Sequence, residues 1–371
     1  MGRSTFIVLL SAMVAGYAHQ TYAADTAAAD QSVRERYQLE EARSPVRESP
    51  GWRKPKRILV VGSFPQLIQQ LEAIGPGVEF VTATSPAEAA SKAADVDAVI
   101  GVCTPEVLAA GKAIRWIQVY TAGVENCVAI PAVRERSILL TNMQRISGPV
   151  MAEHVLAIML AFTRGLDVFI PAQSKRAWRR DAAEGRMTLV RGKTMLVVGL
   201  GGIGSEVARL AHAAGMRVIA TRASGRTGPD YVSYVGLPDE LLKLAGEADV
   251  VVNTAPLTPQ TTGVFDAEFF AKMKPTAYFI NVGRGKSVVT SALVDALSRG
   301  AIAGAGLDVT DPEPLPAEHP LWRAPNVIVT PHVANDSDLG FGAQAEVIKE
   351  NTRRYVAGER MLSVVDVTRG Y

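Results

Sequence analysis

Residues 193–222 constrain the fold more than any other part of the chain. They read KTMLVVGLGGIGSEVARLAHAAGMRVIATR. The apolar run Met195–Gly199 is typical of a buried parallel strand, helical spacing of apolar residues continues to Ala214, and Arg217–Thr221 has the pattern of a second strand. The segment therefore predicts a strand–helix–strand unit with a glycine-rich turn after its first strand.

The glycines of this turn have separate roles in a dinucleotide-binding unit. Gly199 permits the tight turn, Gly201 lets a pyrophosphate approach the backbone, and Gly204 lets the helix pack closely on the strand. The helix N-terminus then presents free amides and a positive dipole end to the phosphates. Such turns can also be purely structural, but the strand and helix on either side favour dinucleotide binding.

The end of the second strand carries information about the cofactor. NAD-binding folds usually place an acidic residue there for the ribose 2′-hydroxyl. This chain has Arg222, followed by Ser224 and Arg226, and no acidic residue before Asp230. A guanidinium suits the 2′-phosphate of NADP, so NADP(H) is favoured and NAD(H) stays possible. The alternative is a solvated basic loop that says nothing about the cofactor.

Strands alternate with helices along most of the chain, which indicates parallel sheets covered on both faces. With 371 residues, 48% of them hydrophobic, the chain is long enough for two domains. The predicted fold class is α/β with two doubly wound parallel-sheet domains. A Rossmann-type cofactor domain over 148–334 is inserted into a flavodoxin-like substrate-binding domain formed by 56–147 and 335–371.

Several connecting segments can be placed on this plan. A polar extension over 24–55 has a helix-compatible patch at Ser32–Ala42, and Ser147–Arg164 predicts a long apolar helix followed by a connecting arm over 165–191. A further strand is predicted over Tyr231–Val235. His154 lies on the long helix and is interpreted as a core or interdomain histidine in preference to a functional one.

The N-terminus has the features of a secretory signal peptide over 1–23. Arg3 precedes the apolar run Phe6–Ala18, and Thr21–Ala23 offers small residues for cleavage. We therefore expect a periplasmic or secreted protein. An uncleaved anchor or a misassigned start codon is the alternative, and the latter would make the protein cytoplasmic.

The rest of the composition limits the partners. No later stretch reaches 18 uninterrupted apolar residues, so no stable membrane insertion of the mature chain is expected. Thirty-nine basic against 37 acidic residues argue against a nucleic-acid partner. Cys103 and Cys127 could pair in an exported protein, but free, partly buried thiols are favoured. Neither cysteine has metal-ligand spacing with a histidine, and no metal is predicted.

Three polar residues follow predicted strands of the second domain. Arg284, Glu313 and His332 come after the strands over 278–281, 306–309 and 326–330, at the sheet edge where open α/β sheets bind their ligands. Arginine can bind a carboxylate bidentately, and an imidazolium can protonate a carbonyl oxygen as hydride reaches its carbon. A carboxylate beside the imidazole would orient it. Taken singly, each residue could be an ordinary surface or loop residue, but together they suit a 2-oxo acid.

Five ordered motifs carry a resemblance to a known family. They are Gly199–Gly204, Asn253–Gly263, Asn281–Gly285, Gly306–Val309 with Glu313-Pro314, and Thr330–His332. Over roughly residues 56–357 the chain resembles the D-isomer-specific 2-hydroxyacid dehydrogenase family, and five motifs in order are far more specific than one.

The resemblance implies a role for individual residues. Arg284 would bind the substrate, Glu313 would support His332, and His332 would be the acid/base. The backbone amides of Ala122, Gly123 and Val124 would also meet the substrate carboxylate, Asp308 would lie near the nicotinamide carboxamide, and the enzyme would be a homodimer. The implied cofactor contacts are Gly199, Gly201, Gly202, Ile203, Gly204, Arg222, Ser224, Arg226, Thr254, Pro256, Thr261, Val282, Arg284, Asp308 and His332.

The predicted function is hydride transfer between NAD(P)H and a small 2-oxo acid of the glyoxylate or hydroxypyruvate type, giving the D-2-hydroxy acid. The alternative is a non-catalytic, NAD(H)-sensing dimeric interaction protein of the same fold. Export conflicts with the enzyme hypothesis, because free NADPH is not expected outside the cytoplasm, and the sequence does not resolve this conflict.

Overall fold

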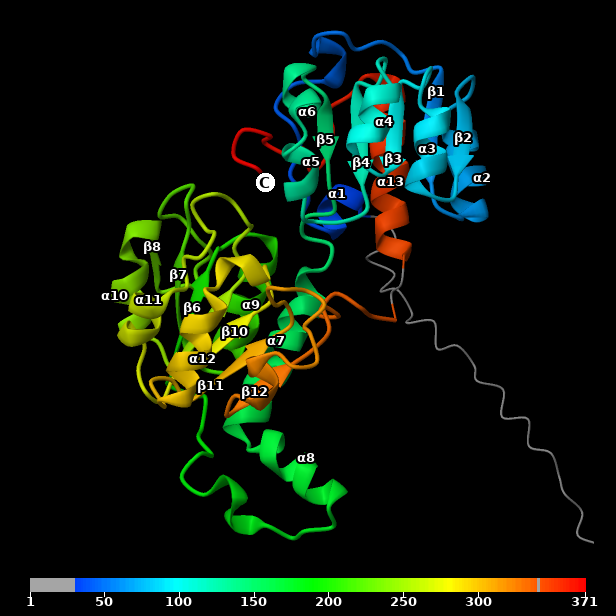
Figure 1. The fold of residues 1–371 in the computed structure, drawn as a ribbon. Helices are drawn as coiled ribbons and strands as arrows, with labels where there is room; N and C mark the ends of the chain where they lie inside the picture. The colour runs from blue at the N-terminus through cyan, green and yellow to red at the C-terminus, as the bar shows by residue number, and fades with distance from the viewer. Residues whose placement is uncertain (1–30, 339–340) are drawn as a thin grey trace, which may run out of the picture.

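The computed structural model describes residues 31–338 and 341–371, so the predicted signal peptide lies outside the described residues. The chain forms two parallel β-sheets, one of five strands and one of seven, and each is packed between helices (Figure 1). The predicted fold class is therefore confirmed.

The five-stranded sheet has the order β2-β1-β3-β4-β5, which is the flavodoxin-like order 2-1-3-4-5. Successive residues of its strands face opposite layers: Leu59 packs with α3 and α4, and Ile58 packs with α2 and with the last helix, α13 (Gly342–Ala357). The strands are β1 (Arg57–Val61), β2 (Glu79–Ala83), β3 (Ala98–Gly101), β4 (Trp116–Val119) and β5 (Leu139–Thr141). The helices are α2 (Pro65–Ile74), α3 (Pro86–Lys92), α4 (Pro105–Ala110), α5 (Glu125–Val128) and α6 (Pro131–Glu135).

The seven-stranded sheet has the order β12-β11-β10-β9-β6-β7-β8. The chain order reverses between β6 and β9, and in an open α/β sheet this switch point is where a ligand binds. The strands are β6 (Thr194–Val198), β7 (Arg217–Thr221), β8 (Tyr234–Gly236), β9 (Val250–Asn253), β10 (Tyr278–Asn281), β11 (Gly304–Leu307) and β12 (Val327–Val329).

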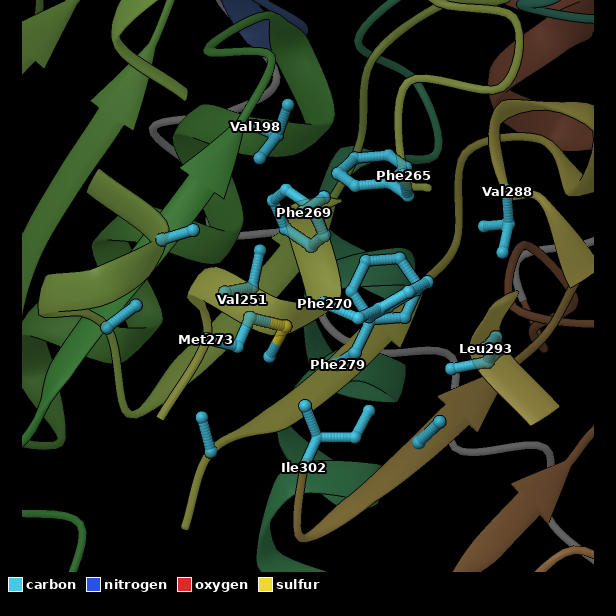
Figure 2. Close-up of a cluster of buried hydrophobic side chains, with 14 of the residues drawn as sticks. Val198, Val251, Phe265, Phe269, Phe270, Met273, Phe279, Val288, Leu293 and Ile302 are labelled. Atoms are coloured by element: carbon cyan, nitrogen blue, oxygen red, sulfur yellow. The ribbon is translucent and has the colours of Figure 1, made fainter. Parts of the chain in front are cut away.

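Helices cover both faces of this second sheet. On one face, Phe269 and Phe270 of α11 cluster with Phe265 and Phe279 (Figure 2), and Leu293 of α12 packs in the same cluster. The other face is covered by α9 and by the long apolar helix α7. The helices are α7 (Gly148–Thr163), α9 (Gly202–Ala213), α10 (Leu241–Glu247), α11 (Ala267–Lys272) and α12 (Thr290–Ser298), with 3₁₀ helices at Pro238–Glu240, Gly285–Ser287 and Pro320–Arg323.

The chain passes between the two sheets after β5 and again after β12 (Figure 1). The last helix, α13 (Gly342–Ala357), packs on α2 and shares a hydrophobic cluster with the strands of the first sheet. The domain limits at 147/148 and 334/335 stay a prediction. The strands of the five-stranded sheet precede residue 148, and those of the seven-stranded sheet lie within 148–334.

Residues 31–55 of the N-terminal extension are part of the folded body. Its predicted helix is shorter than expected: α1 covers Val33–Arg36, and Gln38 then takes a left-handed backbone with φ of 50°. The 3₁₀ helix Val46–Glu48 follows. Leu39 is buried with the residues of α13, and Glu41 forms an antiparallel bridge with Leu362. The extension therefore lies along α13 instead of acting as a loose tether.

The predicted connecting arm over 165–191 contains the helix α8 (Leu166–Ser174) and a 3₁₀ helix at Arg180–Ala183. Figure 1 shows that α8 projects away from the seven-stranded sheet, which α7 covers. Among residues 31–338 and 341–371, no single helix is long and apolar enough to span a bilayer; α7 and α8 reach that length and composition only as a pair bent by 75°.

Two sequence predictions need correction. Cys103 and Cys127 are joined by a disulfide with a Cα–Cα distance of 5.5 Å, so the favoured prediction of free thiols was wrong. The pairing links the end of β3 to α5, which the sequence spacing could not reveal. The strand predicted over Tyr231–Val235 is β8 at Tyr234–Gly236, because the chain turns before reaching the sheet edge.

Candidate active site

The glycine-rich turn lies at the switch point of the seven-stranded sheet. A β-carbon at Gly204 would overlap the carbonyl oxygen of Gly199, so only glycine lets α9 approach β6 this closely. Gly201 and Gly202 begin α9, and a β-carbon at Gly201 would meet nothing within 4 Å. The turn thus combines tight helix packing with open space in front of the helix N-terminus, as a pyrophosphate requires.

The other predicted cofactor residues surround this turn. Thr254 donates from Oγ1 to the carbonyl oxygen of Gly199 at 2.7 Å, and Thr261 donates to that of Pro256 at 2.7 Å. Ile203 lies in the first turn of α9, and Val282 is buried directly after β10. All of them come from segments that follow the C-terminal ends of β6, β9 and β10.

The basic residues after β7 differ in whether an acidic partner neutralises their charge. Arg222 donates from Nε to Ser224 Oγ at 2.7 Å and from Nη1 to the carbonyl oxygen of Thr227 at 3.1 Å, both neutral partners. Arg226 is instead 2.6 Å from Glu240 Oε2, which neutralises its charge. Arg222 is therefore better placed than Arg226 to bind an added phosphate.

His332 and Glu313 form a pair at the C-terminal edge of β11 and β12. His332 Nδ1 lies 2.5 Å from Glu313 Oε1, so the carboxylate holds Nδ1 and leaves Nε2 for another partner. The His332 backbone has φ of 54°, the left-handed region that is costly for a non-glycine residue, and its N–H donates to the carbonyl oxygen of Asp308. Both side chains are exposed enough for a substrate to reach them.

The side chain of Arg284 hydrogen-bonds to two residues, one of which lies in the first domain. Its Nε donates to Glu125 Oε1 at 2.6 Å, and Nη1 donates to the carbonyl oxygen of Gly283 at 2.8 Å. A β-carbon on Gly123 would overlap Nη2 of Arg284, so the guanidinium lies directly against the loop over 121–124. The predicted carboxylate-binding arginine and the predicted carboxylate-binding backbone, with Ala122, Gly123 and Val124, thus meet in space.

Burial raises the pKa of Glu125, but the hydrogen bond and charge of Arg284 outweigh that effect and hold the pKa below its ordinary value. Glu125 is therefore ionised and its ion pair with Arg284 spans the two domains. Sequence reasoning did not assign this residue a role. The available signal was an acidic residue two positions after Gly123 of the substrate loop.

Asp308 is buried and its carboxylate is fully engaged. Oδ1 accepts from Thr330 Oγ1 at 2.6 Å and from the amide of Val333, and Oδ2 accepts from the amide of Ala334. His154 Nε2 lies 3.1 Å from Thr330 Oγ1, and both residues belong to the 148–334 domain, so the hydrogen bond lies within that domain and not between the domains. Through these bonds Asp308 fixes the backbone that carries His332.

A cleft of about 560 Å³ opens between the two sheets at the N-terminus of α9. Gly202, Ser205 and Arg222 line it from the second domain. In the described part of the chain, no group of three or more histidine, cysteine, aspartate or glutamate residues could hold a metal ion.

Comparison with known proteins identifies the family. Residues 156–334 match the NAD-binding domain of D-isomer specific 2-hydroxyacid dehydrogenases. The chain is 32% identical over 273 residues to a glyoxylate/hydroxypyruvate reductase A of Photorhabdus laumondii, covering 72% of this chain and 84% of that protein.

Two solved structures are similar over nearly their whole length. One is a D-isomer specific 2-hydroxyacid dehydrogenase of Xanthobacter autotrophicus in complex with NADPH, with a TM-score of 0.73 and 29% identity over 85% of this chain and 100% of that one. The other is an NADPH-dependent glyoxylate/hydroxypyruvate reductase of Sinorhizobium meliloti in complex with NADP, with a TM-score of 0.73 and 28% identity over the same shares. The chain therefore belongs to the D-isomer specific 2-hydroxyacid dehydrogenase family.

Proposed function

We propose that this protein reduces a small 2-oxo acid of the glyoxylate or hydroxypyruvate type to the D-2-hydroxy acid, with NADPH as the preferred reductant. Membership of the family makes it an NAD(P)-dependent oxidoreductase. The observation that carries the proposal is the His332–Glu313 pair on the sheet edge that also bears Arg284 against the substrate loop. The cited relatives give no support to the non-catalytic alternative.

Substrate binding and proton donation are carried out by different residues of the chain. Arg284 and the backbone amides of Gly123 and Val124 hold the substrate carboxylate, which fixes the neighbouring carbonyl. His332 donates a proton from Nε2 to the carbonyl oxygen, while Glu313 holds Nδ1 and stabilises the charged imidazole. When bound, the nicotinamide supplies the hydride that reaches the carbonyl carbon. Hydride addition to the carbon and protonation of the oxygen by His332 convert the C=O double bond into a C–O single bond with new C–H and O–H bonds.

The turn and the basic loop fit a nicotinamide dinucleotide. Gly201 leaves room at the N-terminus of α9, and Arg222 has only neutral hydrogen-bond partners, which a 2′-phosphate can replace. Because no acidic side chain is placed at the end of β7 for a ribose 2′-hydroxyl, NADP(H) is favoured over NAD(H).

Initial rates with glyoxylate and hydroxypyruvate, each against NADPH and NADH, test the proposal. We expect NADPH oxidation to dominate and Arg222→Asp to shift the preference toward NADH. Arg217→Asp is a matched control, because Arg217 is a surface arginine of the same strand paired with Glu247. Equal rates with the two cofactors in the wild type would contradict the NADP preference. Failure of both substrates under all conditions would contradict the proposed substrate class.

We also propose export, on the sequence pattern of residues 1–23, in which case the enzyme needs cofactor bound before export or another electron source. The disulfide between Cys103 and Cys127 supports it, because disulfides persist in oxidising compartments. Fusion of residues 1–30 to a reporter that is active only outside the cytoplasm tests this proposal. A reporter that stays inactive would support the cytoplasmic alternative.

A homodimer is the assembly we propose, with the arm over 165–191 as its contact. The arm exposes Ile170, Trp178 and Leu189, at 61%, 97% and 66% of their surface. Apolar side chains gathered on one projecting segment are typical of a protein–protein contact, and a two-fold dimer is the commonest way to bury them.

A further inference from the structure

Arg145 lies between the two sheets, directly against the glycine-rich turn. A β-carbon built on Gly202 would be 2.7 Å from Arg145 Cγ and 3.0 Å from Arg145 Cα. Arg145 has φ of 74°, a left-handed conformation that a side-chain-bearing residue rarely adopts. The fold therefore holds the backbone and aliphatic stem of an arginine at the turn assigned above to the pyrophosphate.

The guanidinium of Arg145 has an acidic partner in the N-terminal extension. Arg145 Nη2 lies 2.8 Å from Glu40 Oε1, and the side chain of Glu40 is 67% exposed. The backbone around Glu40 is fixed, because the amide of Ser363 donates to its carbonyl oxygen and the neighbouring Leu39 is buried. Since an exposed carboxylate is a weak partner, a phosphate at the turn can replace it.

The extension also reaches the cleft at this turn. The cleft of about 560 Å³ is lined by Tyr37 and Gln38 of the extension, by Arg145, and by Gly202 and Arg222. Among the described lining residues the acidic one is Glu206, which is paired with Arg209. The wall facing the turn is thus basic, as a site for a doubly charged pyrophosphate requires.

We propose that Arg145 binds the pyrophosphate of the nicotinamide cofactor and that Glu40 competes with the pyrophosphate for the guanidinium of Arg145. The proposal rests on the proposed function, because it assumes that a dinucleotide binds at the turn. It adds a cofactor-binding residue from outside the strand–helix–strand unit. It also gives the N-terminal extension a function, which is to set the affinity for the cofactor.

The pyrophosphate is common to both cofactors, whereas the 2′-phosphate is present only in NADPH. Titration calorimetry of the purified protein with NADPH and with NADH therefore separates Arg145 from Arg222. Arg145→Met keeps the stem that packs on Gly202 and removes the charge, and we expect it to raise both dissociation constants by a similar factor, roughly ten- to hundredfold. Arg145→Lys should keep most of the affinity. Arg222→Ala should weaken NADPH binding alone.

Glu40→Gln should change the cofactor dissociation constants in the direction opposite to Arg145→Met. Removal of the competing charge should lower both dissociation constants roughly two- to fivefold. If the Glu40–Arg145 pair were only structural, Glu40→Gln would leave cofactor affinity unchanged or weaken it. This variant stays informative even if Arg145→Met folds poorly, which circular dichroism and thermal unfolding would reveal.

Each outcome decides one proposal. A wild-type protein that binds neither nucleotide would overturn the proposed function. A wild type that binds normally while Arg145→Met stays within twofold for both nucleotides would overturn only the role of Arg145. An effect of Arg145→Met on NADPH alone would overturn the assignment to the pyrophosphate, and unchanged affinity in Glu40→Gln would overturn the competition.

Discussion

Arg284 Nε lies 2.6 Å from Glu125 Oε1, and the pair joins two residues that are 159 positions apart in the chain. Arg284 follows β10 of the seven-stranded sheet, while Glu125 begins α5 beside the five-stranded sheet. The contact sets both the direction of the guanidinium and the separation of the two domains at the proposed site. A change at Glu125 should therefore affect substrate binding as well as stability.

The lowered pKa of Glu125 gives a pH prediction. A carboxyl group whose pKa is lower in the folded than in the unfolded state stabilises the fold above its unfolded-state pKa, near the ordinary value of 4.5. This stabilisation is lost as the pH falls through the lowered folded-state pKa. Glu125→Gln should therefore lower the free energy of unfolding by about 1 kcal/mol at pH 7, and the difference from the wild type should shrink below pH 4.5.

Urea unfolding of both proteins between pH 3 and pH 7 measures that difference. Glu318→Gln is the control, because Glu318 forms an ion pair with Arg323 in which both side chains are more than four-fifths exposed. A difference between the wild type and Glu125→Gln that stays constant down to pH 3 would contradict the role of the Glu125 carboxylate.

His332→Ala should lower kcat by roughly 10² to 10⁴, because it removes the proposed proton donor. The dissociation constant for NADPH should change little. Glu313→Gln should lower kcat less, since an amide can still accept from Nδ1 but does not stabilise a charged imidazole. His212→Gln serves as the control, because His212 lies exposed in the last turn of α9. Turnover by His332→Ala near the wild-type rate would exclude this histidine as the acid.

Much of the fold could be predicted because periodicity and glycine positions are local signals. The unit from Met195 to Thr221 predicted β6, α9 and β7 within a residue or two. The expected helix over Ser32–Ala42 ends at Arg36, and Gln38 then takes a left-handed backbone, while the neighbouring Tyr37 and Leu39 pack in the hydrophobic cluster that includes α13. The strand predicted from Tyr231 begins only at Tyr234, because the chain first makes a turn in which the amide of Val232 donates to the carbonyl oxygen of Pro229.

In the candidate site, too, some contacts could be predicted from the sequence and others could not. His332 and Glu313 could be paired from the sequence because both follow neighbouring parallel strands, and the structure places them 2.5 Å apart. Residues that do not follow neighbouring parallel strands could not be paired by this reasoning. Glu125 with Arg284 and Cys103 with Cys127 are contacts of the assembled fold, and spacing in the chain carries no signal for them.

The disulfide ends two residues from Glu125, so we expect it to support the substrate loop. Replacing both Cys103 and Cys127 by serine frees a 24-residue segment of the unfolded chain and should lower the free energy of unfolding by about 3 kcal/mol. It should also raise KM for glyoxylate while leaving NADPH affinity unchanged. Urea unfolding, kinetics and calorimetry measure these effects. A rise in the NADPH dissociation constant instead would place the effect of the disulfide on the second domain.

The exposed apolar residues of the arm over 165–191 give a prediction about assembly. Ile170 and Leu189 lie on this segment with 61% and 66% of their surface exposed, and a partner subunit would cover them. Ile170→Asp with Leu189→Asp should place two charges in the contact and convert the dimer to a monomer at micromolar concentration, because unpaired buried charges are costly. Light scattering after size-exclusion chromatography measures the mass. Val289→Asp is the control, since Val289 is an apolar residue 38% exposed at the start of α12. A double variant that keeps the wild-type dimer mass would rule out the arm as the contact, and a monomeric wild type would rule out the dimer.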